Sequence, residues 1–351
     1  SMKSNLIKKS MKKTKTFLII FLFFLFLSPL YAEEIPCVWT GIEEIIAVGD
    51  LHGDYENFIR ILKGTRLTDS ELRWTGGKAF FVQTGDVMNR GPDARKIFDL
   101  IMRLEKEAEK AGGKVQMLLG NHEEMNITGI AFDYPDYVTV EQFVSFLPED
   151  YRQKKEREFR KRMEKGKDLR DYWKEVLKKD KEARKKYISN FNEKYGKWIL
   201  EHNAVIKIND IIFVHGGMSE KYSKWKLEDI NNRLRSELTE LQWAAVNSQS
   251  PKNLNPEIVY KSDGPLWYRQ LAVEDEEIFK AEVDRILLNL KAKYMVIAHT
   301  PRLVVSINDM RRFDGKIWIV DTGISKAYGG HLSALIINNG NFSLWGVSNE
   351  N

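Results

Sequence analysis

From residue 42 onward, apolar residues come in short runs that end in glycine and polar residues. Three runs predict buried strands with polar carboxyl ends: "EEIIAVGD" (43–50), "KAFFVQTGD" (78–86) and "KVQMLLGNHE" (114–123). The patterns of residues 55–62 and 92–110, between these runs, predict helices. Strand, polar end, helix and strand in this order is typical of a parallel sheet covered by helices. Ligands of such sheets collect at the carboxyl ends of the strands.

The later part of the chain has similar runs with turn residues between them. Further strands are predicted in 204–217 (two strands about a tight turn), 294–301, 316–323 and 332–347. The last two segments look like antiparallel hairpins, the final one turning at Asn338-Asn339-Gly340. We therefore predict an α/β fold, a four-layer α/β/β/α sandwich of two mixed sheets.

The N-terminal segment has a different pattern. Within residues 1–32, six lysines precede the apolar run Phe17–Leu27, and the segment ends in the small residue Ala32. This arrangement is typical of a secretory signal peptide, and the apolar run is too short for a comfortable membrane span. We expect an exported protein, periplasmic or secreted, or one in a secretory compartment if its source is eukaryotic. No permanent membrane anchor is expected.

The signal-peptide interpretation changes the meaning of the net charge. The whole chain has a formal charge of +5, of which the six lysines of residues 1–32 supply +6, so residues 33–351 carry −1. A nearly neutral domain does not favour nucleic-acid binding. Cys37 is the only cysteine, which excludes an intramolecular disulfide. Residues 33–351 are therefore expected to form one domain that is stabilised by its core.

Polar residues at the ends of the predicted strands fall into five short motifs. These are "GDLHGD" (Asp50, His52), "GDVMNRG" (Asp86, Arg90), "GNHE" (Asn121, His122, Glu123), "FVHGG" (His215) and "IAHTP" (His299). Mixed Asp, Asn and His donors suit Mn²⁺, Fe or Zn²⁺, whereas a cysteine-rich set would favour structural zinc. A single aspartate such as Asp86 can donate one oxygen to each of two metal ions. Such ions, about 3.5–4 Å apart, clamp the oxygens of a phosphoryl displacement, and the planar fork of Arg90 can reach the phosphate.

At these residues the chain resembles the calcineurin-like metallophosphoesterases, in their phosphoprotein phosphatase branch, and within it the Shewanella-like protein phosphatases. The motifs occur in the family's order: "GDLHGD", "QTGDVMNRGPD", "LLGNHEEMN", "FVHGG", "DGPLWYR" and "IAHTP". The resemblance covers roughly residues 42–345, without much of the charged segment described below. It implies the metallo-dependent phosphatase fold and makes residues 33–351 the catalytic domain.

The resemblance also implies a role for each matching residue. The first metal ion would be bound by Asp50, His52 and Asp86. The second would be bound by Asp86, Asn121, His215 and His299. The phosphate would be held by Arg90, Asn121 and Arg269. Mn²⁺ is the expected metal, with Fe and Zn²⁺ as alternatives. A metal-bridging hydroxide would attack phosphorus directly, without a phosphoenzyme, and His122 would protonate the leaving oxygen.

One position departs from the pattern of the branch, which has Asp-Arg-Gly where this chain has Asn89-Arg90-Gly91. That aspartate normally pairs with the histidine of "GNHE". Asn89 can still accept a hydrogen bond from His122 but supplies no charge to stabilise an imidazolium. Glu123 or another acid could therefore be the partner of His122. His331, after a Gly-rich turn, could border the pocket and contact substrate.

Residues 150–187 hold 17 Lys/Arg and 9 Asp/Glu, a net charge of +8. They belong to a charged helical insertion, which we predict over residues 138–200 between two strands of the active site. Charge runs are usually solvated helix faces. The alternative interpretation is a basic lid that attracts phosphorylated substrates.

We expect a dinuclear-metal phosphomonoesterase that acts on phosphorylated proteins or peptides, or on small phosphomonoesters. A preference for phosphotyrosine rests on the resemblance alone. The alternative is a dinucleoside polyphosphate (diadenosine tetraphosphate) hydrolase, although those enzymes usually have "GNHD" where this chain has "GNHE". A noncatalytic binding protein on the same scaffold would be favoured by lost metal ligands, and none is lost.

Overall fold

The computed structural model describes residues 35–161, 168–249 and 254–346. Contacts divide the chain into residues 1–36 and a larger unit of residues 37–351, and every described helix and strand belongs to the larger unit. The signal peptide expected in residues 1–32 lies outside the described residues. No helix in the described part of the chain combines the length and the apolar character needed to cross a bilayer.

The first sheet has five strands in the order β11-β10-β2-β3-β4. Their bounds are β2 Glu44–Val48, β3 Phe80–Gln83, β4 Lys114–Met117, β10 Ser333–Asn338 and β11 Asn341–Gly346. Strands β2, β3 and β4 are parallel, as the runs of apolar residues predicted, and β10 is antiparallel to both β2 and β11. The β10–β11 turn has positive φ at Asn339 (47°) and Gly340 (78°). This is the conformation that an Asn-Gly hairpin turn favours.

The second sheet has six strands in the order β1-β5-β6-β7-β9-β8. Their bounds are β1 Val38–Trp39, β5 Val205–Ile208, β6 Ile211–Val214, β7 Tyr294–Ile297, β8 Arg311–Arg312 and β9 Ile317–Ile319. Strands β5 and β6 form the predicted hairpin, and β6, β7 and β9 are parallel. The prediction that residues 316–323 form an antiparallel hairpin was wrong for their main pairing. β9 pairs with β7 in parallel and meets only the two-residue β8 in antiparallel.

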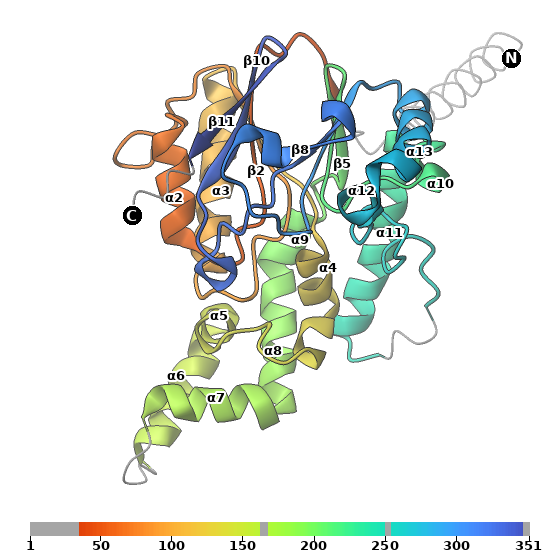
Figure 1. Cartoon of the computed structure of the whole chain (residues 1–351). Coiled ribbons are helices and arrows are strands. Elements are labelled where there is room, and N and C mark those ends of the chain that lie inside the picture. Colours follow the sequence, from red (N-terminus) through yellow and green to blue (C-terminus); the bar gives the residue numbers. More distant parts are fainter. Residues whose placement is uncertain (1–34, 162–167, 250–253, 347–351) are drawn as a thin grey trace, which may run out of the picture. The chain divides into compact units, whose positions relative to one another are not determined.

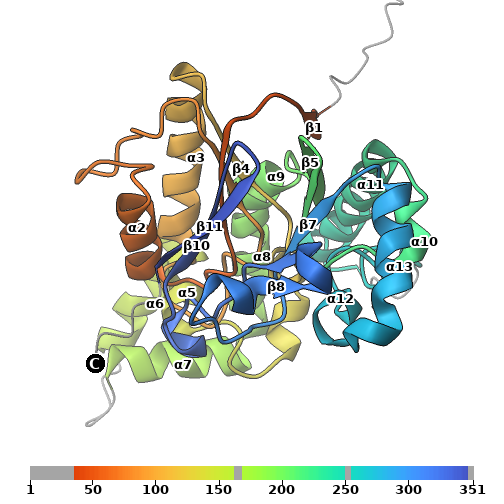
Figure 2. The same ribbon diagram turned by 45° about the horizontal axis from the view of Figure 1, so that its top comes forward.

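Helices cover both outer faces of the paired sheets, as Figure 2 shows. On one side lie α2 (Tyr55–Gly64) and α3 (Ala94–Lys110), which contact β11 and β4 respectively. On the other side lie α10 (Glu220–Ser223), α11 (Leu227–Val246), α12 (Gln270–Val273) and α13 (Glu276–Asn289). Short 3-10 turns occur at η4 (Ile307–Met310), η5 (Phe313–Gly315) and η6 (Lys326–Tyr328). The predicted mixed α/β fold with two mixed sheets is confirmed.

The chain between β4 and β5 is helical. It contains α4 (Asn121–Thr128), η1 (Ile130–Asp133), α5 (Val140–Phe146), α6 (Glu149–Lys161), α7 (Leu169–Lys179), α8 (Lys181–Phe191), η2 (Asn192–Gly196) and α9 (Lys197–Ile199). In Figure 1, α5 to α8 lie at the lower end of the picture, below the strands. The sequence pattern placed residues 114–123 in one strand, but the strand ends at Met117 and Asn121 begins a helix.

Aromatic packing holds these helices together. The rings of Phe143 in α5 and Tyr187 in α8 stack 5.7 Å apart, and Phe143 also meets Trp173 of α7 at 6.5 Å. Phe191 of α8 contacts Phe98 of α3, which ties the group to the covering helices of the first sheet. All five side chains are buried. Burial of each such side chain contributes about 1.5–3 kcal/mol, so α5, α7 and α8 form a packed layer rather than a solvated helical pair.

Candidate active site

The carboxyl ends of five strands bring the polar motifs together. Asp50 and His52 follow β2, Asp86 follows β3, Asn121 and His122 open α4 after β4, His215 follows β6 and His299 follows β7. Each of these seven side chains is at most 6% exposed. Two sheets whose parallel strands end at the same edge thus place residues from 50 to 299 in one buried centre.

The backbone turns sharply at these strand ends. Positive φ values occur at His52 (42°), Asp86 (56°), Asn89 (69°), Arg90 (68°) and His299 (66°). For residues other than glycine this conformation costs about 1–3 kcal/mol each, and it persists where the surrounding structure enforces it. The turns direct these side chains back over the strand ends.

Two groups of donor atoms share Asp86. In the first, His52, Asp86 and His122 offer atoms within 4.8 Å of one another, and in the second Asp86, His215 and His299 do so. Asp50 lies beside the first group, with its Oδ2 3.7 Å from His52 Nε2. An aspartate common to both groups is the arrangement that two neighbouring metal ions require.

Asn121 belongs to the second group by distance. His215 Nε2 lies 3.0 Å from Asn121 Oδ1, 3.2 Å from His299 Nδ1 and 3.3 Å from Asp86 Oδ2. His299 Nε2 is buried and has no hydrogen-bond partner among the described residues. The ring nitrogen of His299 that faces the other donors is Nδ1, so the second group has the donors for a metal ion.

Backbone carbonyls orient two of the histidines. His215 Nδ1 lies 2.9 Å from the carbonyl oxygen of Thr84, and His52 Nδ1 lies 3.2 Å from that of Met88. A carbonyl only accepts, so Nδ1 carries the proton in both rings and Nε2 faces the centre with its lone pair. Metal-binding histidines are commonly held in this way.

Burial and charge set the protonation states. Burial lowers the pKa of His52 to about 3 and that of His299 well below its usual range, so both imidazoles are neutral at neutral pH. Burial also raises the pKa of Asp50 well above its usual value, and the charges of Asp321 and Asp86 add to the rise. Asp321, at a strand end like the others, has its pKa raised to about 6 by burial.

This donor set fits divalent metal ions. Neutral imidazoles are the ligating form of histidine, and buried carboxylates that repel one another are relieved by a nearby cation. The centre therefore combines the ligands of Mn²⁺, Fe or Zn²⁺ with an electrostatic demand for positive charge.

Glu123 accepts hydrogen bonds from backbone amides rather than from the ring of His122. Its carboxylate accepts hydrogen bonds from the amides of Asp86 (2.8 Å), Val87 (2.9 Å) and Gly120 (3.0 Å). Burial raises its pKa to about 7, with the charge of Asp86 adding to the rise. A Cβ at Gly120 would lie 2.2 Å from Asp86 Oδ1, so only glycine allows this approach. Glu123 thus positions the loop that carries the shared aspartate.

The partner of His122 is Asn89. His122 Nδ1 lies 2.9 Å from Asn89 Oδ1, which also accepts a hydrogen bond from Asn126 Nδ2 at 2.7 Å. Because the Asn89 oxygen only accepts, the proton lies on Nδ1 and Nε2 points to Asp86, whose Oδ2 is 3.8 Å away. Burial lowers the pKa of His122, against the opposing effect of Asp86.

A buried hydrogen-bond network extends from Asn89 into the helices between β4 and β5. Asn126 Oδ1 accepts from the Tyr187 hydroxyl at 2.8 Å and from Gln142 Nε2 at 3.3 Å. Gln142 Oε1 accepts from the backbone N–H of Asn89 at 2.7 Å, and Gln142 Nε2 donates to the Tyr187 hydroxyl at 2.8 Å. We term Asn89, Asn126, Gln142 and Tyr187 the His122 network. Sequence reasoning missed three of its members. Only Asn126, one helical turn after His122, had a signal in the pattern.

The two arginines lie at the edge of the centre. The guanidinium of Arg90 stacks 4.2 Å from the ring of Tyr137 and lies 6.0 Å from that of Tyr328, and its Nε has no hydrogen-bond partner among the described residues. Arg269 is exposed, and its Nη1 donates to the carbonyl oxygen of His299 (2.8 Å) and to Thr300 Oγ1 (3.0 Å). Arg90 thus has donor capacity to spare for an anion.

Tyrosines that sequence reasoning missed flank two buried histidines of the centre, His52 and His122. Tyr137 lies 5.0 Å from His122 between ring centroids, and Tyr328 lies 4.8 Å from His52. Tyr134 stacks on Tyr137 at 4.9 Å and is 45% exposed. Two of the three come from the irregular segment after α4, where no periodic pattern marks them.

His331 is placed differently from the other candidates. It is half-buried, its amide donates to the carbonyl of Gly323 at 2.9 Å, and its carbonyl accepts from Thr322 at 3.0 Å. Within the described ranges no hydrogen bond joins its ring to the seven buried residues of the centre. Its contact with substrate stays a prediction.

Comparison with known proteins identifies the class. The model of the family described as "Calcineurin-like phosphoesterase" matches residues 44–303. An uncharacterized protein of Schizosaccharomyces pombe is 31% identical over 299 residues, which cover 84% of this chain and 77% of that protein. The chain therefore belongs to the calcineurin-like phosphoesterase family and is a metal-dependent phosphoester hydrolase.

More specific relatives have functional names. Shewanella-like protein phosphatase 1 of Plasmodium berghei is 29% identical, covering 82% of this chain and 68% of that one. Shewanella-like protein phosphatase 2 of Arabidopsis thaliana is also 29% identical, with coverages of 81% and 72%. A cold-active protein-tyrosine phosphatase of a psychrophilic Shewanella species has the same fold, with a TM-score of 0.63 at 23% identity over 88% of this chain and 79% of that one.

Proposed function

We propose that this protein is a phosphoprotein phosphatase that works with two divalent metal ions. The observation that carries the proposal is the position of Asp86, which is shared by two buried groups of His and Asp donors. The names of the Shewanella-like protein phosphatase relatives support phosphoproteins as the substrate class.

The first metal ion is held by Asp50, His52 and Asp86. The second is held by Asp86, Asn121, His215 and His299. When bound, the ions act as Lewis acids and supply a nucleophile at neutral pH. Mn²⁺ is our first choice, and Fe and Zn²⁺ suit the same donors.

The remaining residues bind the phosphate and move a proton. The guanidinium of Arg90, whose Nε has no partner among the described residues, binds phosphate oxygens, and Arg269 and the amide of Asn121 assist. His122 delivers a proton to the leaving oxygen from Nε2. To do so it must carry protons on both nitrogens, and Asn89 supports that form only through the oxygen that accepts from Nδ1.

The aromatic surroundings favour an aryl phosphate. Tyr137 lies against both His122 and Arg90, and the exposed Tyr134 stacks on it at an interplanar angle of 16°. An aromatic ring next to the phosphate can pack on this pair, which gains about 0.5–1.5 kcal/mol beyond burial. We therefore propose a preference for phosphotyrosine over phosphoserine.

The test is hydrolysis by residues 33–351 after chelation and again with Mn²⁺ restored. The substrates are p-nitrophenyl phosphate, a phosphotyrosine peptide, the matched phosphoserine peptide and diadenosine tetraphosphate. We expect metal-dependent release from the aryl phosphate and the phosphotyrosine peptide. Cleavage of the dinucleotide alone would replace the proposal by a dinucleoside polyphosphate hydrolase. No turnover of any substrate by a metal-loaded sample would indicate a binding protein.

A further inference from the structure

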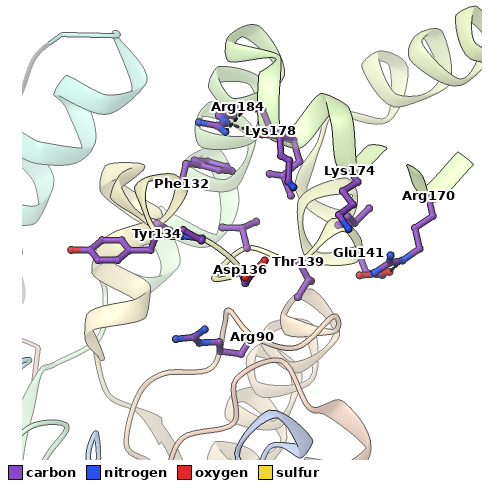
Figure 3. Close-up of a pocket in the computed structure, with 15 residues that line it drawn as sticks. Arg90, Phe132, Tyr134, Asp136, Thr139, Glu141, Arg170, Lys174, Lys178 and Arg184 are labelled. Atoms are coloured by element: carbon purple, nitrogen blue, oxygen red, sulfur yellow. Dashed lines mark hydrogen bonds and ion pairs between the residues drawn. The ribbon is translucent and has the colours of Figure 1, made fainter. Parts of the chain in front are cut away.

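A groove of about 520 Å³ opens between the segment after α4 and the helices α7 and α8 (Figure 3). Cationic side chains outnumber acidic ones in its lining. The cationic residues are Arg90, Arg170, Lys174, Lys178 and Arg184, and the acidic ones are Asp136 and Glu141. We call this feature the basic groove.

Three of the cations come from one face of α7. Arg170, Lys174 and Lys178 recur every fourth residue, which places them along one side of the helix, and all three are exposed. Trp173 and Val176 of the same helix are buried against the neighbouring helices. The buried residues hold α7 in place and thereby present the cationic side to the groove.

The cations differ in what already neutralises them. Arg170 Nε forms an ion pair with Glu141 at 2.8 Å. Arg184 donates to the carbonyl oxygens of Leu177 (2.8 Å) and Lys178 (2.9 Å) at the end of α7, which leaves its charge uncompensated. Lys174 and Lys178 have no ion-pair partner in the described part of the chain. Their charges are therefore free to attract an anionic ligand.

The basic groove is continuous with the active centre. Arg90 lines the groove and also stacks 4.2 Å from Tyr137, whose ring lies 5.0 Å from that of His122. Figure 3 shows Arg90 below Asp136, with Tyr134 to one side and Lys174 and Arg170 to the other. A substrate whose phosphate lies at Arg90 can thus extend its neighbouring residues along α7.

The lining favours a peptide over a bare polyanion such as polyphosphate. Apolar and aromatic side chains, among them Phe132, Tyr134, Val138 and Leu177, share the groove with the cations. Asp136 lies within the groove as well and would repel an unbroken run of phosphates. A peptide offers both apolar side chains and separated negative charges, and so matches this mixture.

We propose that the basic groove binds acidic side chains that flank the phosphorylated residue of a peptide or protein substrate. The inference rests on the proposed phosphoprotein phosphatase function and adds its sequence preference. Lys174 and Lys178 are the specificity-determining residues, because their charges are uncompensated and lie on the face of α7 that borders the groove.

The kinetic test uses two phosphotyrosine peptides that differ only in their flanks, three Glu or three Gln on each side of the phosphotyrosine. We expect kcat/KM to be about tenfold higher for the Glu peptide at low salt, through KM, and the ratio to fall as salt is added. The double variant Lys174→Gln/Lys178→Gln should reduce the ratio to about twofold or less. A ratio of two substrates is unaffected by loss of folded enzyme.

The matched control is Lys181→Gln/Lys185→Gln. These lysines are exposed on α8 and do not line the groove, and their substitution removes the same charge as the first double variant. The control should keep the wild-type ratio. An equal loss of preference in both double variants would mean that net charge alone attracts the peptide, and it would overturn the groove.

The outcomes separate this inference from the proposed function. Metal-dependent release of phosphate from both peptides with equal kcat/KM would contradict the proposed role of the groove but agree with the proposed phosphatase function. If neither peptide is hydrolysed, a binding experiment replaces the kinetics. The same two peptides, with phosphonomethyl-phenylalanine in place of phosphotyrosine, are titrated with the protein, and binding is measured by fluorescence anisotropy. Tighter binding of the Glu peptide supports the groove, and equal binding overturns it. If polyphosphate hydrolysis requires Lys174 and Lys178 and the Glu peptide is not preferred, the ligand of the groove is a polyanion and the proposed peptide ligand is wrong.

Discussion

The candidate metal centre and the His122 network differ in how their buried polar groups are satisfied. In the centre, burial raises the pKa values of Asp50 and Asp321, and the charge of Asp86 adds to both increases. In the helices, the hydroxyl of Tyr187 and the side chain of Gln142 are bonded to other protein groups. The carboxylates of the centre would thus be relieved by a cation, whereas the polar groups of Tyr187 and Gln142 are paired within the protein.

This difference separates the residues proposed to bind metal from those that position His122. Because the centre carries the proposed metal ligands, substitutions there should change activity and metal content together. The helices α4, α5 and α8 reach the Nδ1 side of His122 through Asn126, Gln142 and Tyr187, which hold Asn89 in place. Changes in that layer should therefore alter the rate while both metal ions stay bound.

The largest effect should come from Asp86→Asn. Loss of the shared carboxylate removes a ligand from both donor groups, so we expect kcat/KM to fall at least about 10³-fold and the content of both metals to drop. Elemental analysis beside phosphatase kinetics measures this. Asp150→Asn, at an exposed position of α6, is the control and should change neither quantity. Near-normal turnover of Asp86→Asn would contradict the bridging role.

Arg90→Ala should come next. Removal of the guanidinium that we propose binds the phosphate should lower kcat/KM by about 10²–10³-fold, with a higher KM and a lower kcat, while metal content stays the same. Arg90→Lys keeps the charge but loses the planar fork, so its activity should lie between those of wild type and Arg90→Ala. Loss of metal from Arg90→Ala would place this residue in the metal site instead.

Asn89→Ala should reduce kcat by about 10–100-fold with little change in KM, because it removes the oxygen that holds Nδ1 of His122. Asn89→Asp keeps that acceptor, and the Nδ2 atom it loses has no partner among the described residues. The aspartate variant should therefore retain at least wild-type kcat. Equal losses in both variants, at unchanged metal content, would show that the oxygen of Asn89 does not serve His122.

The smallest effect should come from Tyr187→Phe, which removes a hydroxyl two hydrogen bonds away from Asn89. We expect a loss of about 0.5–1.5 kcal/mol in the free energy of unfolding and a decrease of roughly 2–10-fold in kcat. Tyr195→Phe removes a hydroxyl that contacts Asp99 and Arg95, with no link to His122. Denaturant unfolding and kcat measured for both variants separate lost stability from lost positioning. An equal change in kcat would contradict the network.

The strand ends of the candidate site could be predicted because short-range rules govern them. Runs such as "EEIIAVGD" mark a buried parallel strand, and the polar residue after the glycine lies at the ligand-binding edge. The metal-site candidates from Asp50 to His299 were therefore found, and the structure brings them together. The same rules placed the β5–β6 and β10–β11 hairpins through their Asn-containing turns.

Longer-range features were not predictable from the pattern. Gln142 bonds to Asn89 directly, and Tyr187 does so through Gln142 and Asn126, from two helices that are far from Asn89 in sequence. Helical spacing marks the buried face of α8 but not the partner of the Tyr187 hydroxyl. Glu123 was a candidate partner of His122, but in the structure its oxygens accept from the amides of Asp86, Val87 and Gly120. Tyr134 and Tyr137 lie in an irregular segment, where hydrophobic pattern carries no information.

The sequence by itself therefore determined most of the strands, the order of the candidate metal-binding motifs and the excess of positive charge in residues 150–187, because these depend on neighbouring residues and composition. Only the tertiary structure decided that Asp86 lies in two donor groups, that Asn89 is the partner of His122, and that Lys174 and Lys178 border a groove next to Arg90. These relations join residues that are distant in the chain, and packing of the whole domain sets the distances between them.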